Sequence, residues 1–429
     1  KTNMQDILAD LRWRGLVHQT TDDENLGSWL NAQARTLYAG FDPTSDSLHV
    51  GSLLPLITLR RFQRAGHVPI ALVGGATGMI GDPSGKSDER NLLDVDALRH
   101  NIHGMTEQMR QFLDFDCANA AMVVNNFDWM RPFSYLDFLR DIGKNFPVNV
   151  MMAKDSVKSR LEGESGISYT EFSYMLLQAY DFVHLHSQHG CELQIGGSDQ
   201  WGNITAGIDL ARRMRSVQLY GLTMPLLLTS DGRKMGKTEK GAIWLSAEKT
   251  SPYQFYQYWM NVADEDAGSC LRTLTELSHE EIGSLDASRA EQAHQRESQK
   301  RLAEELTRMV HGEDGLASAL RATEIFFGAE ISDLSDAQLS QIFADVPSQE
   351  LPKDRLAGDG LNIIDALHEA GLSKSKGEAR RTITQGGAYV NNRRVEGIDR
   401  QLTSDDLASE TVMVLRSGKK KYALLRFRD

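Results

Sequence analysis

A chain of 429 residues with 41% hydrophobic residues, 25% charged residues and a formal net charge of -12 has the composition of a large globular protein. Its length allows an extensive core and two or three domains, which excludes a single small binding module. The negative charge argues against a protein that coats DNA, and no apolar run approaches the ~20 residues of a membrane span.

The N-terminal and cysteine patterns bear on location. Residues 1–10 lack the apolar core of a signal peptide. Cys117, Cys191 and Cys270 lie far apart and form no Cys-x-x-Cys pair, so we expect neither a disulfide framework nor a structural metal. These features together predict a cytoplasmic protein with no membrane partner.

Strand and helix patterns alternate through the first part of the chain. Strands are expected at 35–41, 67–73, 121–124, 193–195 and 224–228, and helices at 50–65, 135–142, 169–184 and 204–214. Alternation of this kind is typical of a parallel α/β sheet.

Helical patterns then take over. Pro252 suits the start of a helix, and 291–310 is predicted as one long amphipathic helix. The following stretch, 333–360, is polar and contains Pro347 and Pro352, which favours a linker.

The last segment, 361–429, is predicted as a compact unit of helices and strands. Its expected elements are helices at 363–370 and 374–385 and strands through Tyr389 and 412–415. Ser373 is the expected cap of the second helix, and Gly386 its expected end. The segment carries 13 Lys and Arg against 9 Asp and Glu, so it is basic although the whole chain is acidic.

Two segments far apart in the chain carry residues suited to binding phosphate. Residues 48–51 (Leu-His-Val-Gly) lie where a turn meets the start of a helix, whose free amides favour phosphate. Residues 231–238 (Asp-Gly-Arg-Lys-Met-Gly-Lys-Thr) form a polar loop after an apolar strand, with a glycine for mobility between two lysines. Either segment alone is more often a simple turn or a solvated loop. Together they resemble the two ATP signatures of class I aminoacyl-tRNA synthetases.

A competing phosphate site lies at 81–87 (Gly-Asp-Pro-Ser-Gly-Lys-Ser). A P-loop needs glycine where this chain has Ile80, and Pro83 removes an amide donor. A P-loop or other metabolic nucleotidyl transferase is therefore the weaker alternative, and it leaves the basic tail without a role.

Longer matches point to one family. Residues 38–44, 74–78, 174–181 and 196–203 match, in order, patterns of bacterial tyrosyl-tRNA synthetases, which the chain resembles along almost its whole length. The resemblance implies an α/β protein with a Rossmann-like parallel-sheet catalytic domain. The implied domains are a catalytic domain with an inserted connective and dimerisation region at 1–245, an α-helical anticodon-side domain at 246–332, the linker at 333–360 and a small α+β S4-like RNA-binding domain at 361–429.

Tyr174, Gln178 and Asp181 have the spacing of one helix face. A polar helix face usually meets solvent, but the residues between these three are mostly apolar, so we expect this face to line a pocket. The resemblance implies that Asp181 and Tyr38 bind the phenol of tyrosine, which favours tyrosine over tryptophan, the nearest rival substrate. The other implied tyrosine-binding residues are Tyr174, Gln178 and Asp82 at the ammonium, and Gln200 near the carboxylate.

The resemblance also implies ATP as co-substrate, with Mg²⁺ carried mainly on its phosphates. The implied ATP-binding residues are Asp42, His49, Gly51, Gly196, Gly197, Asp199, Lys234, Met235, Gly236 and Lys237. The implied catalytic residues, which act on the pyrophosphate side, are Thr44, His49, Lys86, Arg90, Lys234, Lys237 and Thr238. The first signature commonly ends in a second histidine, whereas this chain has Ser52, so we expect altered ribose contacts without loss of activity.

Basic residues supply the candidate RNA contacts. They are Lys374, Lys376, Arg380 and Arg381 in the S4-like segment, with Arg212 and Arg213 as weaker candidates for the acceptor stem. A solvated charged face explains such a cluster equally well from charge alone, but behind a synthetase body contact with an RNA backbone is the better explanation. The resemblance implies tRNA(Tyr) as partner, no DNA, and a homodimer. A non-catalytic RNA-binding scaffold is disfavoured because His49, Asp181 and the lysine loop are all present.

Overall fold

The computed structural model describes residues 6–84, 94–163, 166–239, 241–332, 334–344 and 346–428. The chain divides into two compact units. The first unit comprises Lys1–Lys249 and Trp259–Val310, and the second comprises Thr250–Tyr258 and His311–Asp429.

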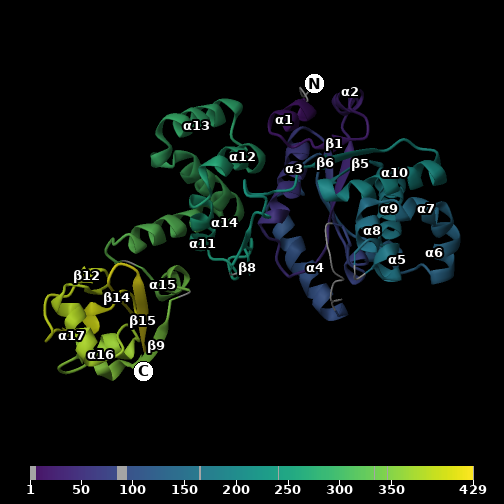
Figure 1. Cartoon of the computed structure of the whole chain (residues 1–429). Helices are drawn as coiled ribbons and strands as arrows, with labels where there is room; N and C mark the ends of the chain where they lie inside the picture. Colours follow the sequence, from purple (N-terminus) through teal and green to yellow (C-terminus); the bar gives the residue numbers. More distant parts are fainter. Residues whose placement is uncertain are drawn as a thin grey trace. The chain divides into compact units, whose positions relative to one another are not determined.

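The first unit is built on a six-stranded sheet. Its strands, in order across the sheet, are β1 (Gln19–Thr20), β6 (Tyr220–Met224), β5 (Cys191–Gly197), β2 (Thr36–Phe41), β3 (Val68–Val73) and β4 (Met122–Asn125). All neighbouring strands are parallel except β1, which runs antiparallel to β6. The sheet has helices on both faces, with α3 (Leu53–Arg64) on one side and α9 (Tyr169–His189) and α10 (Trp201–Arg215) on the other (Figure 1). Because both faces are covered, the central strands are apolar almost throughout.

The strand order reverses between β2 and β5. From β2 the chain proceeds outward to β3 and β4, and it returns to the other side of β2 with β5 and β6. Ligands of open parallel sheets bind beyond the carboxyl ends of the strands at such a reversal. The register sets Tyr38 of β2 beside Gln194 of β5, so both side chains are available to that crevice.

Most strands and helices of the first unit lie where the sequence predicts them. The segments expected at 35–41, 67–73, 121–124 and 169–184 correspond to β2, β3, β4 and α9, and the parallel α/β sheet is confirmed. The strand expected at 224–228 is wrong, because β6 ends at Met224. Pro225 has no amide to continue the ladder, and the apolar residues after it line a cavity instead.

The helices that follow depart from the prediction in their bounds. Instead of a helix over 291–310, α13 (His279–Gln292) ends early and α14 (Glu297–Phe326) begins after it. A capping box between Ser278 and Glu281 begins α13, and Arg296 adopts a left-handed conformation before α14. Gly312, with φ 73°, interrupts α14 beside the boundary between the two units.

The second unit contains a five-stranded sheet. Its strands, in order, are β12 (Arg393–Arg394), β11 (Ala388–Val390), β14 (Val412–Ser417), β15 (Lys421–Arg428) and β9 (Ser348–Pro352). The helices predicted here are present as α16 (Ile363–Glu369) and α17 (Lys376–Thr384). The predicted cap of α17 is wrong, because Ser375 caps this helix by accepting a hydrogen bond from the backbone N–H of Glu378.

The segment 333–360 is not a linker. It contributes α15 (Asp336–Ile342) and β9, and β9 pairs in parallel with β15. Leu339 and Phe343 are buried in the core of the second unit. The prolines that suggested a linker lie beside or at the end of β9, an edge strand, where a missing amide is tolerated. The remaining domain boundaries stay predictions.

This correction predicts a stability effect. Phe343 is 1% exposed and contacts the rings of Phe326 and Tyr422, so Phe343→Ala should lower the free energy of unfolding by about 3 to 5 kcal/mol. The matched control is Gln341→Ala, an exposed position two residues away in the same segment. Chemical denaturation measures both, and equal small effects would support a linker instead.

Candidate active site

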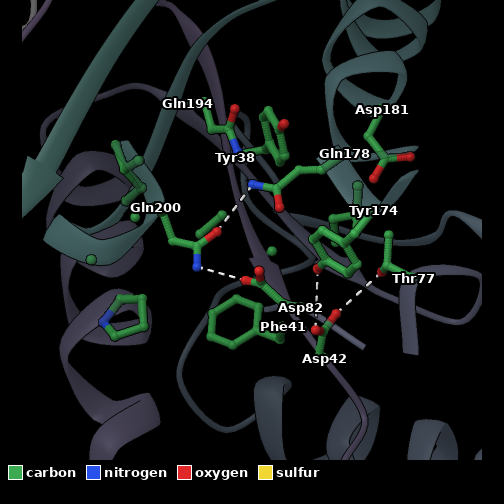
Figure 2. Close-up of a pocket in the computed structure, with 17 residues that line it drawn as sticks. Tyr38, Phe41, Asp42, Thr77, Asp82, Tyr174, Gln178, Asp181, Gln194 and Gln200 are labelled. Atoms are coloured by element: carbon green, nitrogen blue, oxygen red, sulfur yellow. Dashed lines mark hydrogen bonds between the residues drawn. The ribbon is translucent and has the colours of Figure 1, made fainter. Parts of the chain in front are cut away.

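A cavity of about 190 Å³ opens at the carboxyl ends of β2 and β5 (Figure 2). Its walls come from the ends of these two strands, the loops that follow β3, and the inner face of α9. Tyr174, Gln178 and Asp181 all line it, which confirms the prediction that these three residues share a helix face that lines a pocket. This position matches the crevice expected from the strand reversal.

The deep end of this cavity holds buried polar atoms that need partners. Tyr38 is 1% exposed and Gln194 is 2% exposed. Among the described residues, neither the Tyr38 hydroxyl nor the Gln194 Oε1 atom has a hydrogen-bond partner. Burial and the nearby Asp181 carboxylate raise the pKa of Tyr38 well above its usual value, so the hydroxyl keeps its proton. A buried polar atom without a partner costs about 1 to 3 kcal/mol, so this end suits a ligand with a polar group.

Asp181 is the buried carboxyl group of the same region. Its oxygens accept hydrogen bonds from Asn126 Nδ2 at 3.0 Å and from Trp129 Nε1 at 2.8 Å. Burial raises its pKa to about 7, although these two donors favour the ionised form. A third donor from a ligand would lower the cost of the charge further.

The outer part of the cavity concentrates negative charge. Tyr174 donates its hydroxyl proton to Asp42 Oδ2 at 3.2 Å, and Gln200 Nε2 donates to Asp82 Oδ2 at 2.8 Å. Gln178 Nε2 donates to Gln200 Oε1 at 3.3 Å, which continues the network across the cavity. No Lys or Arg is present among the described residues that line it. The chemistry suits a cationic group such as an ammonium.

A second cavity brings the two phosphate-binding signatures together. His49, Gly51 and Asp199 line it with the lysine loop, which contributes Lys234, Met235, Gly236 and Lys237. The backbone connects the signatures through Ile243, which directly follows the short strand β8 (Gly241–Ala242). Val50 N–H donates to Ile243 O at 3.0 Å, and Ile243 N–H donates to Gly236 O at 2.8 Å.

Gly236 is required by this close approach. Its φ is 81°, and a Cβ atom added there would lie 2.6 Å from Val50 Cβ. Glycine alone adopts the left-handed conformation at little cost and leaves room for the neighbouring signature.

The electrostatics of the second cavity suit an anion. Burial, together with Lys237 and Lys234, lowers the pKa of His49, so this ring is neutral near pH 7. His49 Nδ1 accepts the backbone N–H of Gly51 at 3.0 Å, which fixes the ring. Burial raises the pKa of Asp199, the one carboxyl group in the described lining.

Some predicted residues lie elsewhere. Asp42 lies in the first cavity and not in the second. Thr44 is exposed and lines neither cavity, and exposed Thr238 donates its hydroxyl proton to Gly241 O at 3.1 Å. Lys86 and Arg90 lie outside the described residues. Ser52 stands at the N-cap of α3 without a side-chain capping bond.

The candidate RNA contacts are all on the surface. Lys374, Lys376, Arg380 and Arg381 are exposed at the start of α17 and along it, in the second unit. Lys376 also forms an ion pair with Asp365 at 2.7 Å. The pair Arg212 and Arg213, at the end of α10, forms ion pairs with Asp209 at 2.6 and 2.7 Å.

Sequence reasoning missed three polar residues of the first cavity and its surroundings. Gln194 interrupts an apolar strand, and Asn126 directly follows β4, where the carboxyl end of a parallel strand is the expected place for a functional side chain. Trp129 gives no such signal, because an indole in an apolar helix usually indicates core.

Within the ranges given above, no group of three or more His, Cys, Asp and Glu side chains is placed to hold a metal ion. No helix in those ranges has the length and apolar character of a membrane span.

Comparisons with known families cover nearly the whole chain. The family described as tRNA synthetases class I (W and Y) matches residues 31–328, and the Tyrosine--tRNA ligase SYY-like C-terminal domain matches residues 338–425. A tyrosine–tRNA ligase of Rhodopirellula baltica is 62% identical over 423 residues, which cover 99% of this chain and 97% of the relative. The tyrosine–tRNA ligase of Geobacillus stearothermophilus is 50% identical over 424 residues, 98% of this chain and 100% of the relative.

Solved structures agree with these matches. A C-terminally truncated mitochondrial tyrosyl-tRNA synthetase of Aspergillus nidulans superposes with a TM-score of 0.67 at 28% identity, over 75% of this chain and 94% of that one. A tryptophanyl-tRNA synthetase of Plasmodium falciparum, at 15% identity and a TM-score of 0.53 over 80% of this chain and 91% of that one, shares the fold. With a class I model over more than half of its length and tyrosine–tRNA ligases similar to almost all of it, the chain belongs to the bacterial-type tyrosyl-tRNA synthetases.

Proposed function

We propose that the first cavity is the tyrosine site and the second the ATP site of this synthetase. The chain activates L-tyrosine with ATP, which yields tyrosyl-adenylate and diphosphate, and it transfers the tyrosyl group to tRNA(Tyr) with release of AMP. The observation that carries the assignment of the tyrosine site is the buried pair of Tyr38 and Asp181 at its deep end.

A phenol satisfies this deep end. Its O–H donates to the Asp181 carboxylate, while the Tyr38 hydroxyl, which has no partner among the described residues, pairs with the phenol oxygen. Phenylalanine leaves the Tyr38 hydroxyl unpaired, at about 1 to 3 kcal/mol, and gives Asp181 no third donor. Tryptophan would place a larger ring against the same groups, so the pair also explains the choice of tyrosine within the class.

The rest of the amino acid lies toward the acidic outer part. We assign its ammonium to Asp82, Tyr174 and Gln178, which already form hydrogen bonds around the cavity. Asp42 accepts the Tyr174 hydroxyl and adds negative charge, so its role belongs to tyrosine at least as much as to ATP. Gln200 lines the same cavity and is assigned to the tyrosine carboxylate.

ATP lies between the glycines at the end of β5 and the lysine loop. The Gly196–Gly197 backbone and Asp199 face the ribose, and His49, Lys234 and Lys237 face the phosphates. The tyrosine carboxylate attacks the α-phosphorus of ATP, and the bond from that phosphorus to the diphosphate oxygen breaks as the new P–O bond forms. Positioning and fixed charge supply the catalysis, since no covalent intermediate with the enzyme is needed.

The remaining catalytic candidates are retained as proposals for the leaving diphosphate. They are Thr44, Lys86, Arg90 and Thr238. Mg²⁺ is assigned to the ATP phosphates, because the described lining of the second cavity offers the single carboxyl group of Asp199 and Mg²⁺ keeps few protein ligands when it binds with a nucleotide.

The tRNA is assigned to basic surfaces of both units. Exposed Lys374, Lys376, Arg380 and Arg381 offer contacts to an RNA backbone, and Arg212 and Arg213 offer contacts to the acceptor stem. The ion pairs with Asp209 are exposed and weak, so they are readily exchanged for phosphate. ATP and tRNA are cytoplasmic reactants, and we place the enzyme in the cytoplasm.

A second copy of the chain is the proposed partner of an apolar surface on the first unit. This surface lies on α6 (Tyr135–Asp141), α7 (Val148–Met152) and the start of α9. Leu136 is 74% exposed, and exposed Val148 lies on α7. The hydroxyls of exposed Tyr135 and Tyr169 join α6 to α9 at 3.2 Å. Grouped exposed apolar residues of this kind mark interaction sites, and the homodimer implied by the family fits this one.

Tyr38→Phe and Asp181→Asn test the phenol assignment. Tyr38→Phe should reduce the preference for tyrosine over phenylalanine in pyrophosphate exchange about 2- to 10-fold, the effect of one neutral hydrogen bond. The pKa of the empty Asp181 is about 7, and a bound phenol lowers it by stabilising the ionised form. Tyrosine affinity should therefore be highest above about pH 7 and fall as the pH decreases below it. Calorimetry on Asp181→Asn should show weaker binding without this pH dependence, and an unchanged profile would refute the assignment.

Gly236→Ala tests the contact between the two signatures. We expect kcat of pyrophosphate exchange to fall about tenfold or more, because the added Cβ displaces the loop lysines from the phosphates. Gly232→Ala is the control: Gly232 has φ 83° in the same loop, but its Cβ would meet no atom within 4 Å. Equal losses in the two variants would attribute the effect to backbone strain and not to the contact.

Leu136→Lys tests the dimer. Sedimentation should show that the parent is a dimer and that this variant dissociates, since a charge in the centre of the apolar surface must be desolvated for assembly. Val95→Lys, which changes an exposed valine outside this surface, should remain dimeric. A monomeric parent, or a dimeric Leu136→Lys, would contradict the proposal.

A further inference from the structure

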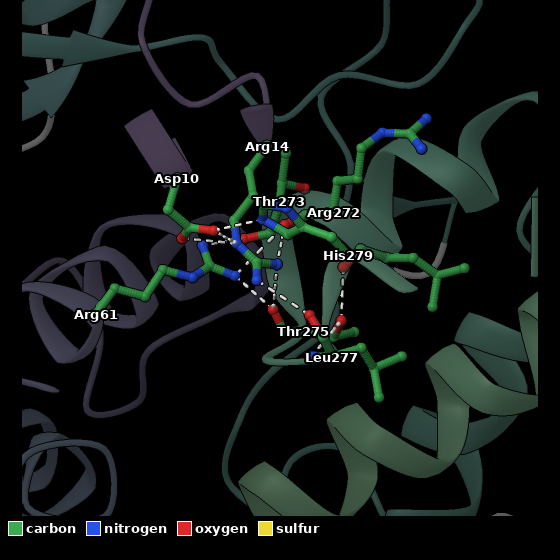
Figure 3. Close-up of polar contacts among 9 residues, drawn as sticks. Asp10, Arg14, Arg61, Arg272, Thr273, Thr275, Leu277 and His279 are labelled. Carbon is green, nitrogen blue, oxygen red and sulfur yellow. Dashed lines mark hydrogen bonds and ion pairs between the residues drawn. The ribbon is translucent and has the colours of Figure 1, made fainter. Parts of the chain in front are cut away.

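Two buried arginines hold the C-terminal end of α12 (Asp264–Leu274) in the first unit (Figure 3). Arg14 Nη1 donates to Arg272 O at 3.1 Å and Arg14 Nη2 to Leu277 O at 3.0 Å. Arg61 Nη1 donates to Thr273 O at 2.9 Å. The last carbonyls of a helix have no partner within it and carry partial negative charge, so two guanidinium groups satisfy this end.

Burying two charged arginine side chains costs free energy, which indicates that they have a structural role. Arg14 is 7% exposed and Arg61 is 6% exposed, and burial together with the charge of Arg14 lowers the pKa of Arg61. The Asp10 carboxylate lies beside them: it accepts from Arg14 Nε at 2.9 Å and also contacts His279 Nε2 at 2.8 Å. The carbonyl contacts offset the remaining cost, so this end of α12 is fixed to α1 (Ile7–Trp13) and to α3.

The other part of α12 touches the lysine loop. Asp266 in its first turn is 8% exposed, and its Oδ1 atom accepts the backbone N–H of Ser230 at 2.8 Å. One turn further along, Cys270 Sγ lies 3.5 Å from Met235 Sδ, inside the second signature. The first contact lies one residue before the 231–238 loop, and the second lies in its middle, next to Lys234.

We propose that α12 is a brace that positions the lysine loop over the ATP phosphates, with Asp266 as the positioning residue. The proposal rests on the assigned role of the loop in diphosphate departure. α3 begins at Leu53, shortly after the first signature, and carries Arg61, which donates to α12. The helix α12 therefore contacts both the lysine loop and the helix that follows the first signature. Asp266 touches no substrate in this scheme and acts through the loop backbone.

The first test compares Asp266→Ala with Asp266→Asn. Alanine removes the acceptor of the Ser230 N–H, whereas the amide oxygen of asparagine still accepts it. In pyrophosphate exchange, Asp266→Ala should lower kcat about tenfold and raise the KM for ATP, while Asp266→Asn stays within about twofold of the parent. The Kd for tyrosine should not change, because that site is built on β2, β5 and α9. Glu265→Ala, an exposed carboxylate next in sequence, is the control.

A second variant removes the donor and leaves α12 intact. Gly232 N–H donates to Thr229 O at 2.8 Å, so Ser230 occupies the second position of a tight turn, where proline is well tolerated. Ser230→Pro deletes the amide that Asp266 accepts, and Ser230→Ala keeps it. We expect Ser230→Pro to reproduce the loss of Asp266→Ala and Ser230→Ala to match the parent.

Limited trypsin digestion of the folded proteins gives a readout that does not depend on activity. Cleavage after Arg233 and Lys234 should be faster in Asp266→Ala and Ser230→Pro than in their controls, at unchanged Tm. The brace is refuted if both variants keep kcat and cleavage rates within about twofold of the controls, or if tyrosine binding weakens as much as kcat falls. Absence of exchange in the parent would instead refute the proposed function, and the cleavage rates would still decide the brace.

Discussion

The buried carboxyl group of Asp181 is the constraint on which the proposed tyrosine site depends. Two donors, Asn126 and Trp129, hold it, yet burial still raises its pKa to about 7, so one more donor stabilises its charge. The phenol is assigned as that donor. Asp181 is on α9, the helix that also presents Tyr174 and Gln178, so the position of the carboxyl group also sets the position of the proposed ammonium site. The reversal of strand order supplies the crevice, and the polar residues that line it are the proposed source of its selectivity.

The two proposed sites of the first unit are built from different kinds of element. The proposed tyrosine cavity is lined by central strands of the sheet and by the long helix α9. The proposed phosphate side is formed by the lysine loop, in which Gly236 O accepts the backbone N–H of Ile243, and Ile243 O in turn accepts the N–H of Val50. Gly236 leaves room for the close approach of Val50 to the loop, and the proposed brace, α12, contacts the loop region through Asp266. A loop held at a few points can bind and release diphosphate while the amino-acid site stays fixed.

The sequence predicts the parallel sheet well because its strands are continuous apolar runs. It also predicts the polar face of α9, since helical spacing alone places those residues together. It fails where the signal is ambiguous: apolar residues after Met224 line a cavity instead of extending β6, and prolines around the edge strand β9 resemble a linker. Single residues such as Gln194 follow no periodicity. The contacts of Arg14 and Arg61 with α12 join positions more than 200 residues apart, which no local pattern encodes.

The measurement that most directly tests the central claim compares amino acids as substrates of the unmodified protein in exchange of pyrophosphate into ATP. If buried Tyr38 and Asp181 select a phenol, tyrosine should be preferred over phenylalanine in kcat/KM by about 10⁴ to 10⁵, a range for which tyrosyl-tRNA synthetases are themselves the established example, and tryptophan should support no exchange. Comparable exchange with tyrosine and phenylalanine, or exchange with tryptophan alone, would contradict the account.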